Sequence, residues 1–409
     1  MLELWVRAKR DSRKMPMVLR KYYKGWDIRL GTIKAHTIKK LDSLPFDFTA
    51  FNIVLLGSDD GVLFEELSEF SSPMFGVVMV DSPQVRTEKV SSIFKRIEFA
   101  KSTMRNGVGF VDNAFLLNGV NQIEVPLSVD SDCYFVYPEH AENLKKNFKL
   151  DFDIPYYTIA FRDNNEEFVF LEENNFLRIK KPDRGNLEVI GKQSPPLRRV
   201  CIDFNKTVSL NREYIENLKN EAIKFLHPFK DFKAVIPLSG GKDSQAVLDI
   251  AVNVWDKEKL LCIHADTGFD FKYNREHAEY LCEEYNVNLK VIELHLDKKG
   301  TPDFSRWCTF EKTEKMYEVA KQWGGKVYLM GDRDGESFKR RRKPRKRVLQ
   351  GITHLYPLKF WSTAHLQVLI ELSGKEINPL YKKGFWRTGC ASCPFLTQWE
   401  RVLTGNTNQ

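Results

Sequence analysis

The stretch Ser239-Gly240-Gly241-Lys242-Asp243-Ser244 decides the fold of the C-terminal half of the chain. The apolar run 234–238 precedes it, and a segment with helical periodicity, 244–255, follows it. A glycine-rich turn between a buried strand and a helix presents free backbone N–H groups at the positive end of the helix dipole. The stretch therefore predicts a loop that binds the phosphates of ATP or a close relative.

Each residue type in this loop suits a phosphate site. Gly240 and Gly241 allow the backbone to approach phosphate oxygens, and the hydroxyl groups of Ser239 and Ser244 can donate hydrogen bonds. Lys242 adds positive charge, and the Asp243 carboxylate is the kind of ligand that Mg²⁺ prefers. The alternative is a strand-to-helix turn with a structural role alone.

Strands and helices alternate along the segment that contains the loop. Beyond the first strand and helix, the periodicity predicts strands at 260–264, 289–294 and 326–330, and helices at 272–285 and 310–322. Asn211 is expected to cap a further helix that ends before Pro228. The predicted fold is α/β, with a parallel-sheet domain over 211–409 whose ligands bind at the carboxyl ends of the strands.

The segment before this domain follows a different pattern. Residues 1–190 predict an α+β region with strands near 51–56 and 76–80 and a helix near 91–104. Apolar and polar residues alternate over 156–190, and asparagine and proline turns interrupt this pattern, which predicts hairpins. The region divides into one or two modules, with a break near 140–155 in the second case. Residues 191–210 are polar and contain prolines, which predicts a linker.

Composition restricts the class of protein. Of 409 residues, 42% are hydrophobic and 29% are charged, as in ordinary globular proteins. The N-terminal residues do not resemble a signal peptide, and no uninterrupted apolar run approaches the ~20 residues of a membrane span. We expect a cytoplasmic protein without a membrane partner. Seven cysteines, an odd number, argue against a disulfide framework.

The hexapeptide resembles the PP-loop of the N-type ATP pyrophosphatases, whose domains have a HUP-like fold. More of the chain resembles one branch of them, the phosphoadenosine phosphosulfate (PAPS) reductase family. The similar stretches, in the family's order, are His264-Ala265-Asp266-Thr267-Gly268-Phe269, Arg306-Trp307-Cys308-Thr309, Gly331-Asp332-Arg333-Asp334-Gly335-Glu336-Ser337, Tyr356-Pro357-Leu358 with Trp361, Asn378-Pro379-Leu380-Tyr381, and Gly384 to Pro394.

The resemblance implies a nucleotide site built from three segments. Beside the loop, it places His264, Asp266, Thr267 and Gly268 at the end of the second strand. It places a second group at the mouth of the fourth strand: Gly331, Arg333, Glu336 and Ser337. It also implies that the catalytic residues are Lys242, Asp243, Asp266 and Arg333. In the alternative, Asp266 caps the next helix and Arg333 pairs with Glu336 on the surface.

Cys308, Cys390 and Cys393 lie in these family stretches. Three thiolates can hold a [4Fe-4S] cluster with one iron left open, so an iron-sulfur site is one expectation. A zinc site and free or redox-active thiols are the alternatives. Cys262 and Cys282 are expected in the core.

The segment 339–347 carries eight positive charges and no negative ones, within a chain whose net charge is +8. Pro344 prevents a regular helix there, so we expect a flexible loop at the rim of the pocket. Its functional interpretation is a contact with the phosphates of RNA or DNA, and the alternative is a solvated loop.

These features favour an ATP-splitting, adenylating sulfur-transfer enzyme that acts on a nucleic acid such as tRNA and uses ATP and Mg²⁺. The phosphate loop is intact, and no cysteine follows Cys393 to match the terminal nucleophile of sulfonucleotide reductases. Two alternatives remain: a PAPS or APS reductase, and a nucleotide-gated nucleic-acid-binding protein of a DNA modification or defence system.

Overall fold

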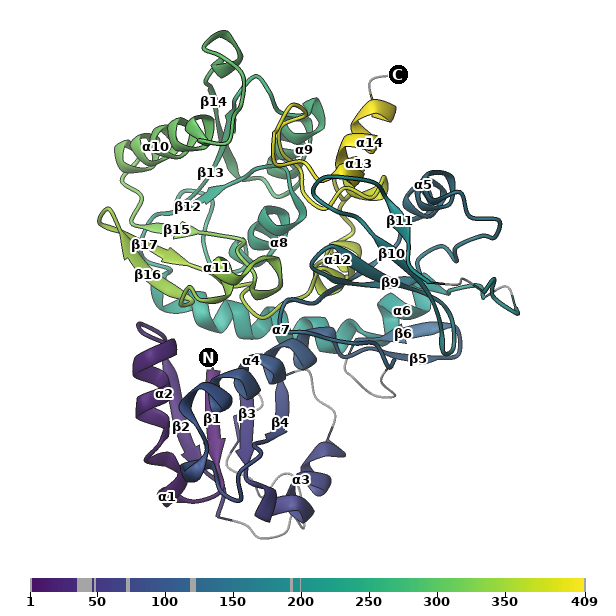
Figure 1. Ribbon diagram of the computed structural model, residues 1–409. Helices are drawn as coiled ribbons and strands as arrows, with labels where there is room; N and C mark the ends of the chain where they lie inside the picture. The colour runs from purple at the N-terminus through teal and green to yellow at the C-terminus, as the bar shows by residue number, and fades with distance from the viewer. Residues whose placement is uncertain are drawn as a thin grey trace.

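The computed structural model describes residues 2–34, 46–47, 49–70, 74–117, 123–191, 194–198 and 200–407 (Figure 1). The first hundred or so residues form the lower lobe in this view. The remaining chain forms the upper lobe, which contains an antiparallel sheet and a larger, mostly parallel sheet.

The larger sheet carries the glycine-rich loop. Its six strands run in the order β14-β13-β12-β15-β17-β16, and all neighbouring pairs are parallel except β16 with β17. Its strands are β12 (Ala234–Pro237), β13 (Leu260–Asp266), β14 (Asn288–Glu293), β15 (Val327–Leu329), β16 (Lys346–Leu349) and β17 (Ile352–Leu355). The predicted parallel α/β domain is confirmed, and its four expected strands all form.

Helices cover both faces of this sheet, so alternate strand residues point into different cores. On β12, Ala234 and Ile236 pack on the side of α7, α8 and α12, whereas Val235 packs on the side of α10. The helices of this domain are α7 (Arg212–Leu226), α8 (Lys242–Ala251), α9 (Lys272–Glu284), α10 (Trp307–Gln322), α11 (Phe338–Arg341), α12 (Thr363–Ser373), α13 (Pro379–Lys382) and α14 (Gln398–Thr407).

Asn211 precedes α7 as predicted, but its side chain does not cap that helix. Its amide donates to the carbonyl oxygens of Phe115 and Thr207, both at 2.7 Å. Asn211 therefore ties α7 to the short hairpin β5 (Gly109–Val111) and β6 (Ala114–Leu116).

The lower lobe is a four-stranded parallel sheet in the order β2-β1-β3-β4. Thus the first part of the region expected to be α+β is itself parallel. Its elements are β1 (Leu2–Val6), α1 (Lys9–Ser12), α2 (Met15–Tyr22), β2 (Ile28–Thr32), β3 (Phe51–Leu56), α3 (Gly61–Ser68), β4 (Phe75–Met79) and α4 (Val90–Asn106). Helix α4 lies between this sheet and the upper lobe (Figure 1).

The second part is an antiparallel sheet in the order β11-β10-β9-β8-β7, which confirms the predicted hairpins. Asn164 and Asn174 take positive φ angles, of 55° and 58°, in its turns. The elements are β7 (Asp132–Phe135), α5 (Pro138–Phe148), β8 (Ile159–Asp163), β9 (Glu166–Glu172), β10 (Asn175–Lys180) and β11 (Glu188–Val189).

Two sequence-based boundaries differ from the structure. Strand β7 precedes the expected break near 140–155, yet it pairs with β8, so the two N-terminal sheets separate before residue 132. Part of the expected linker is helical, because α6 (Phe204–Leu210) lies within 191–210. A side chain far along the sequence holds β7 in place, since Gln367 on α12 hydrogen-bonds the backbone of Phe135 in β7 at 2.7 and 2.9 Å.

The antiparallel sheet and the C-terminal segment share a core. Tyr134 and Val136 on one side pack in the same cluster as Leu380, Phe385 and Trp399 on the other. In the part of the chain that the structure describes, no helix combines the length and hydropathy needed to span a membrane.

Candidate nucleotide site

The local geometry requires glycine at position 240 and packs Gly241 closely against side chains. Gly240 has φ of +75°, and a Cβ there would lie 2.2 Å from the carbonyl oxygen of Asn274. A Cβ on Gly241 would lie 2.9 Å from the Thr388 hydroxyl and 3.0 Å from that of Tyr381. The loop is therefore folded tightly against the C-terminal segment, and α8 begins immediately after it.

Lys242 and Arg333 both bind the Asp243 carboxylate. Nζ of Lys242 lies 2.8 Å from Oδ2, and Nε of Arg333 lies 2.6 Å from Oδ1. Burial works against the charge of Lys242, but Asp243 and Tyr381 more than offset it and raise its pKa. Burial likewise opposes the charge of Asp243, yet the two cations hold its pKa well below the ordinary value. All three groups are thus charged at neutral pH.

Arg333 is buried and is also bound from outside the C-terminal domain. Its Nη1 lies 3.0 Å from Oδ2 of Asp132, a β7 residue, and its Nη2 lies 2.9 Å from the Thr363 hydroxyl. Thr363 in turn donates to Asp132 from its backbone N–H and its hydroxyl, at 3.0 and 2.8 Å. The alternative in which Arg333 pairs with Glu336 on the surface is therefore wrong. Arg333 is instead clamped between two carboxylates.

The mouth of β15 adds a second set of charged groups. Glu336 accepts a hydrogen bond from the backbone N–H of Arg333 at 2.8 Å and pairs with Arg340. Burial, then repulsion from Asp243, raises the pKa of Glu336. A Cβ on Gly331 would lie 2.9 Å from Cβ of Asp243, so this strand end fits closely against the start of α8.

These groups line one cavity of about 810 Å³. The predicted site residues on its wall are Ser239, Gly241, Lys242, Asp243, Ser244, Gly331, Arg333, Glu336 and Ser337. Gly240 lies in the same loop but turns toward Asn274. The structure thus brings together two of the three predicted segments.

The third segment, at the end of β13, does not line this cavity. Asp266 accepts a hydrogen bond from the backbone N–H of Gly268 at 2.9 Å and lies 3.7 Å from Arg275. The Thr267 hydroxyl donates to Asp270 at 2.7 Å, and Nδ1 of His264 contacts the Leu238 carbonyl oxygen at 2.8 Å. These residues organise the loop beside β12.

The three family cysteines do not fit a metal centre. Among the residues that the structure describes, no group of three or more His, Cys, Asp or Glu side chains is arranged to hold a metal ion. Sγ of Cys390 instead lies 3.8 Å from both Thr267 and Asp270, and burial, followed by the Asp270 charge, raises the pKa of this thiol to about 12. The family stretches place the three cysteines in one domain, but among the described residues they do not form a group of three metal ligands.

The basic segment is not a flexible loop, which corrects the prediction. It forms α11 and then β16, which pairs with β17, and Pro344 lies between them. Arg345 is buried and binds Glu221 of α7 through two hydrogen bonds, of 2.6 and 2.9 Å. Arg341 is also buried and lies 3.2 Å from Glu98 of α4 and 2.6 Å from Asp130.

Other charges of this segment also have partners. Lys343 binds Asp332 at 2.5 Å, and Nε of Arg347 donates to the Tyr356 hydroxyl at 2.6 Å. Its exposed members are Lys339, Arg342 and Lys346. Distant carboxylates therefore bind Arg341 and Arg345, and a nearby carboxylate binds Lys343. The contact of Arg341 with Glu98 of α4 joins the two lobes.

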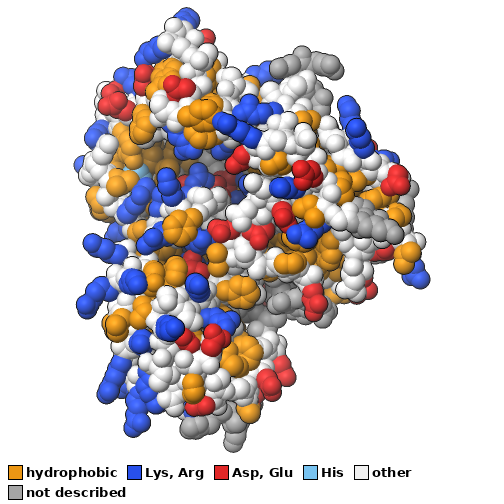
Figure 2. All heavy atoms as spheres, viewed as in Figure 1, with side chains coloured by type: hydrophobic (Ala, Val, Ile, Leu, Met, Phe, Trp, Pro, Cys, Tyr) orange, Lys and Arg blue, Asp and Glu red, His pale blue; other side chains and the backbone are white. Residues whose placement is uncertain are grey.

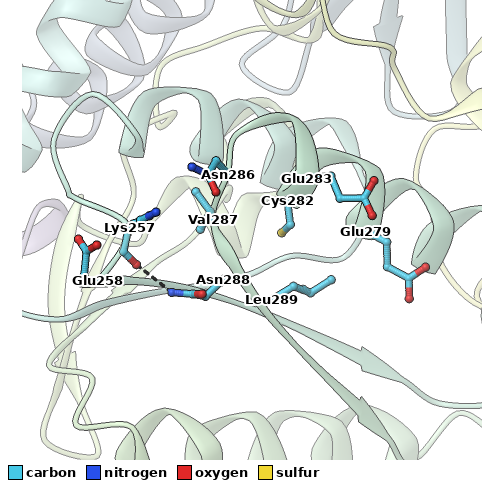
Figure 3. A pocket seen from close by; sticks show the side chains of 9 residues that line it. All are labelled: Lys257, Glu258, Glu279, Cys282, Glu283, Asn286, Val287, Asn288 and Leu289. Carbon is cyan, nitrogen blue, oxygen red and sulfur yellow. Dashed lines mark hydrogen bonds between the residues drawn. The ribbon is translucent and has the colours of Figure 1, made fainter.

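A second hollow, of about 550 Å³, lies away from the loop, beside α9 and β14 (Figure 3). It is lined by Lys257, Glu258, Glu279, Cys282, Glu283, Asn286, Val287, Asn288 and Leu289. Asn288 begins β14, so this hollow lies at the amino end of that strand, where parallel sheets do not usually bind ligands. None of the predicted site residues lies there.

Sequence reasoning missed several residues of the main cavity. Asp132 gave no local signal, because its partner Arg333 lies about two hundred positions further along the chain. Tyr381 and Thr388 belong to the family stretches but had been given no role, although both line the cavity. The packing of both hydroxyl groups against Gly241 is visible only in the folded chain.

The parallel sheet, the glycine-rich loop at the end of β12 and the helix that follows are the features on which the resemblance to a PP-loop domain rests. Residues 233–396 match the family model for the phosphoadenosine phosphosulfate reductase domain. The chain therefore carries a domain of this family, as the sequence motifs predicted.

Relatives share parts of the chain. An uncharacterized protein of Methanocaldococcus jannaschii is 26% identical over 269 residues, which are 61% of this chain and 64% of that protein. A second uncharacterized protein of this organism is 27% identical over 216 residues, 48% of this chain and 44% of that protein. The chain thus matches less than two thirds of the length of either relative.

Similarity to named reductases is more distant. The phosphoadenosine 5'-phosphosulfate reductase of Baumannia cicadellinicola subsp. Homalodisca coagulata is 22% identical over 164 residues, 37% of this chain and 67% of that protein. A PAPS reductase structure from Candida auris, in a phosphate complex, covers 49% of this chain and 98% of its own, at 18% identity and a TM-score of 0.35.

Proposed function

We propose that the chain is an ATP-splitting enzyme that transfers the adenylyl group to an acceptor and releases pyrophosphate. The observation that carries this proposal is the position of Lys242, a residue that is only 5% exposed and lines the main cavity from the first turn of α8. A buried cation at a helix N-terminus stabilises an anionic ligand through both its own charge and the backbone N–H groups.

The proposed chemistry relies on positioning and charge. An acceptor oxygen attacks the α-phosphorus, a P–O bond to the acceptor forms, and the bond to the β-phosphate oxygen breaks with its electron pair on pyrophosphate. Lys242 and the loop N–H groups then stabilise the leaving charge. Arg333 cannot swing freely, because Asp132 and Asp243 fix its guanidinium group, so it serves as a rigid part of the same electrostatic surface.

Asp243 does not fit the role of a ready Mg²⁺ ligand. Both of its oxygens already accept hydrogen bonds from cations, Lys242 and Arg333. It fits better as the group that orients these two cations. Mg²⁺ instead binds together with ATP, because it coordinates polyphosphate oxygens and several waters.

The adenosine end of the nucleotide is assigned to the segment 264–268. This segment follows β13, the strand next to β12, and so lies on the ligand-binding edge of the sheet. Gly268 has φ of +82°, and a Cβ there would lie 2.3 Å from Asp297, so the turn requires glycine. Asp266, predicted to be catalytic, is then a positioning residue that fixes this turn.

The chemical identity of the acceptor is a more specific part of this proposal. We assign it to a base carbonyl of a nucleic acid such as tRNA, and the second nucleophile to an external sulfur donor at the oxidation level of sulfide. Sulfur attacks the adenylated carbon, the C–S bond forms, and AMP leaves with the electrons of the C–O bond. Cys390 is not the donor in this scheme, because its raised pKa keeps it a thiol.

ATP titration of the full chain by calorimetry tests the nucleotide site. The Lys242→Ala variant should bind ATP about 10- to 100-fold more weakly, the loss expected for a hydrogen bond to a charged group. Lys257→Ala is the matched control, because Lys257 is exposed beside the second hollow and should bind ATP as the unaltered chain does. Equal affinity of the two variants, or no ATP binding by the unaltered chain, would overturn the proposed site.

A further inference from the structure

The outer wall of the main cavity is built from guanidinium groups that lie over aromatic rings. Arg162 lies 4.2 Å from the ring centre of Trp386, Arg184 lies 5.3 Å from that of Phe304, and Arg306 lies 4.1 Å from that of Phe395. The rings of Phe304 and Phe395 are themselves in edge contact, with centres 5.3 Å apart. These six side chains, called the rim below, all line the cavity that contains Lys242.

The charge of the rim is not neutralised within the protein. Of the ion pairs formed by the residues that the structure describes, none includes Arg162, Arg184 or Arg306. In contrast, Arg333 and Arg345 are buried against carboxylates. The arginines of the rim are thus available to an external anion, whereas the dense basic segment 339–347 is largely occupied.

The rim also exposes aromatic surface. Phe304 is 59% exposed, so its ring is accessible to a ligand beside the charged cavity. Figure 2 shows Lys and Arg side chains around a hollow in the upper half of the visible face, with hydrophobic side chains between them. A surface of this kind matches a ligand that is both flat and anionic, since rings and guanidinium planes stack on bases while the charges attract phosphates.

Two parts of the chain contribute to the rim. Arg162 lies on β8, and Arg184 lies between β10 and β11 of the antiparallel sheet, outside the family domain at 233–396. Arg306, Phe304, Trp386 and Phe395 come from within that domain. The antiparallel sheet therefore contributes to the wall of the same cavity as the phosphate loop that holds ATP in the proposed function.

We propose that the rim binds the acceptor, and that the acceptor is an unpaired segment of single-stranded RNA. Phosphates contact Arg162, Arg184 and Arg306, and exposed bases stack on Phe304 and its neighbours. Paired bases are stacked inside a duplex and cannot reach these rings, so the rim selects single strands. This inference rests on the proposed adenylyl transfer, because it places the acceptor beside the nucleotide.

Fluorescence anisotropy with a labelled single-stranded RNA of about twelve nucleotides, a length within the usual site sizes, tests the rim. The variant Arg162→Gln/Arg184→Gln/Arg306→Gln should lose at least about tenfold in affinity. Its slope of log affinity against log salt should fall by about 2, since each phosphate contact on a single strand contributes about 0.7. Phe304→Ala should also weaken binding at least about fivefold, from the loss of one stacked base.

The matched control removes the same number of charges elsewhere. Lys339→Gln/Arg342→Gln/Lys346→Gln alters exposed members of the basic segment and should leave affinity and salt slope unchanged. Equal losses in the two triple variants, or no loss in the rim variant, would overturn the proposal, as would equal affinity for a duplex of the same length. Thermal unfolding of each variant shows that the fold is kept. Calorimetry measures ATP binding by the unaltered chain independently of RNA binding. A wrong nucleotide site would therefore be distinguished from a wrong RNA site at the rim.

Discussion

Replacing Asp132 by Asn perturbs the site from outside the family domain. Asp132 is 7% exposed and accepts hydrogen bonds from Arg333 at 3.0 and 3.2 Å and from Thr363 at 2.8 and 3.0 Å. The NH2 group of an asparagine is itself a hydrogen-bond donor, so on one side of the amide group it would face the donors of Arg333 or Thr363 and accept no hydrogen bond from them. Breaking a buried ion pair from one side costs about 3–5 kcal/mol. In the variant, Arg333 still forms its ion pair with Asp243. We therefore expect the free energy of unfolding to fall by about 3 kcal/mol, the lower end of this range.

Urea unfolding followed by tryptophan fluorescence measures this loss. Asp153→Asn is the matched control, since Asp153 is 65% exposed in a surface pair with Lys145, and such pairs contribute at most about 1 kcal/mol. The Asp132→Asn variant should also bind ATP more weakly, because Arg333 and Asp243 form one network with Lys242. A free-energy loss no larger than that of Asp153→Asn would refute the clamp.

The pH dependence of this loss follows from the Asp132 carboxyl group. Burial opposes its charge, but the charge of Arg333 and the hydrogen bonds from Thr363 together outweigh burial, so the pKa of Asp132 in the folded chain lies below its ordinary value of about 3.9. The stability that this group contributes is therefore present above about pH 4 and is lost as the pH falls through the folded pKa. The difference between the unaltered chain and Asp132→Asn should shrink only below about pH 4. A difference that shrinks between about pH 5 and 7 would contradict this origin.

Other changes give separate tests. Gly240→Ala should abolish ATP binding, because its Cβ would meet a backbone carbonyl oxygen at 2.2 Å; Gly374→Ala, at φ of +67° with nothing within 4 Å, should affect ATP titrations little. Arg345→Ala should lower the urea midpoint by the equivalent of about 3 kcal/mol, whereas the exposed Arg342→Ala should stay within about 0.5 kcal/mol, and equal effects would show that the buried pair of Arg345 with Glu221 does not stabilise the fold. Anaerobically purified protein should contain no stoichiometric iron-sulfur cluster; a visible chromophore that disappears in Cys308→Ala would show that the cysteines do converge.

Local sequence signals predicted the parallel domain well. The apolar runs over 234–238 and 260–264 became β12 and β13, because a strand buried on both faces reads as a continuous apolar stretch. The phosphate loop was equally visible, since the tight turn requires glycine at position 240. Features that depend on a few adjacent residues were therefore predictable.

Long-range pairing was not visible in the sequence. The segment 339–347 predicted a flexible loop because its carboxylate partners, Glu98, Asp130 and Glu221, lie more than a hundred positions earlier. The same limitation concealed Asp132 and the arginines of the antiparallel sheet. Conversely, the order of the cysteines in a shared segment suggested a cluster, although spacing along the chain does not determine whether side chains meet in the fold.

Product analysis with ATP labelled at the α- or γ-phosphate, in the presence of single-stranded RNA and a sulfide donor, tests the central claim most directly. Adenylyl transfer predicts AMP and pyrophosphate in equal amounts, with transient label from the α-phosphate on the RNA and none from the γ-phosphate. Lys242→Ala should lose both products, because Lys242 faces the cavity from the start of α8. Release of ADP and phosphate would contradict the account, as would intact ATP here together with sulfite release in a parallel reaction supplied with PAPS.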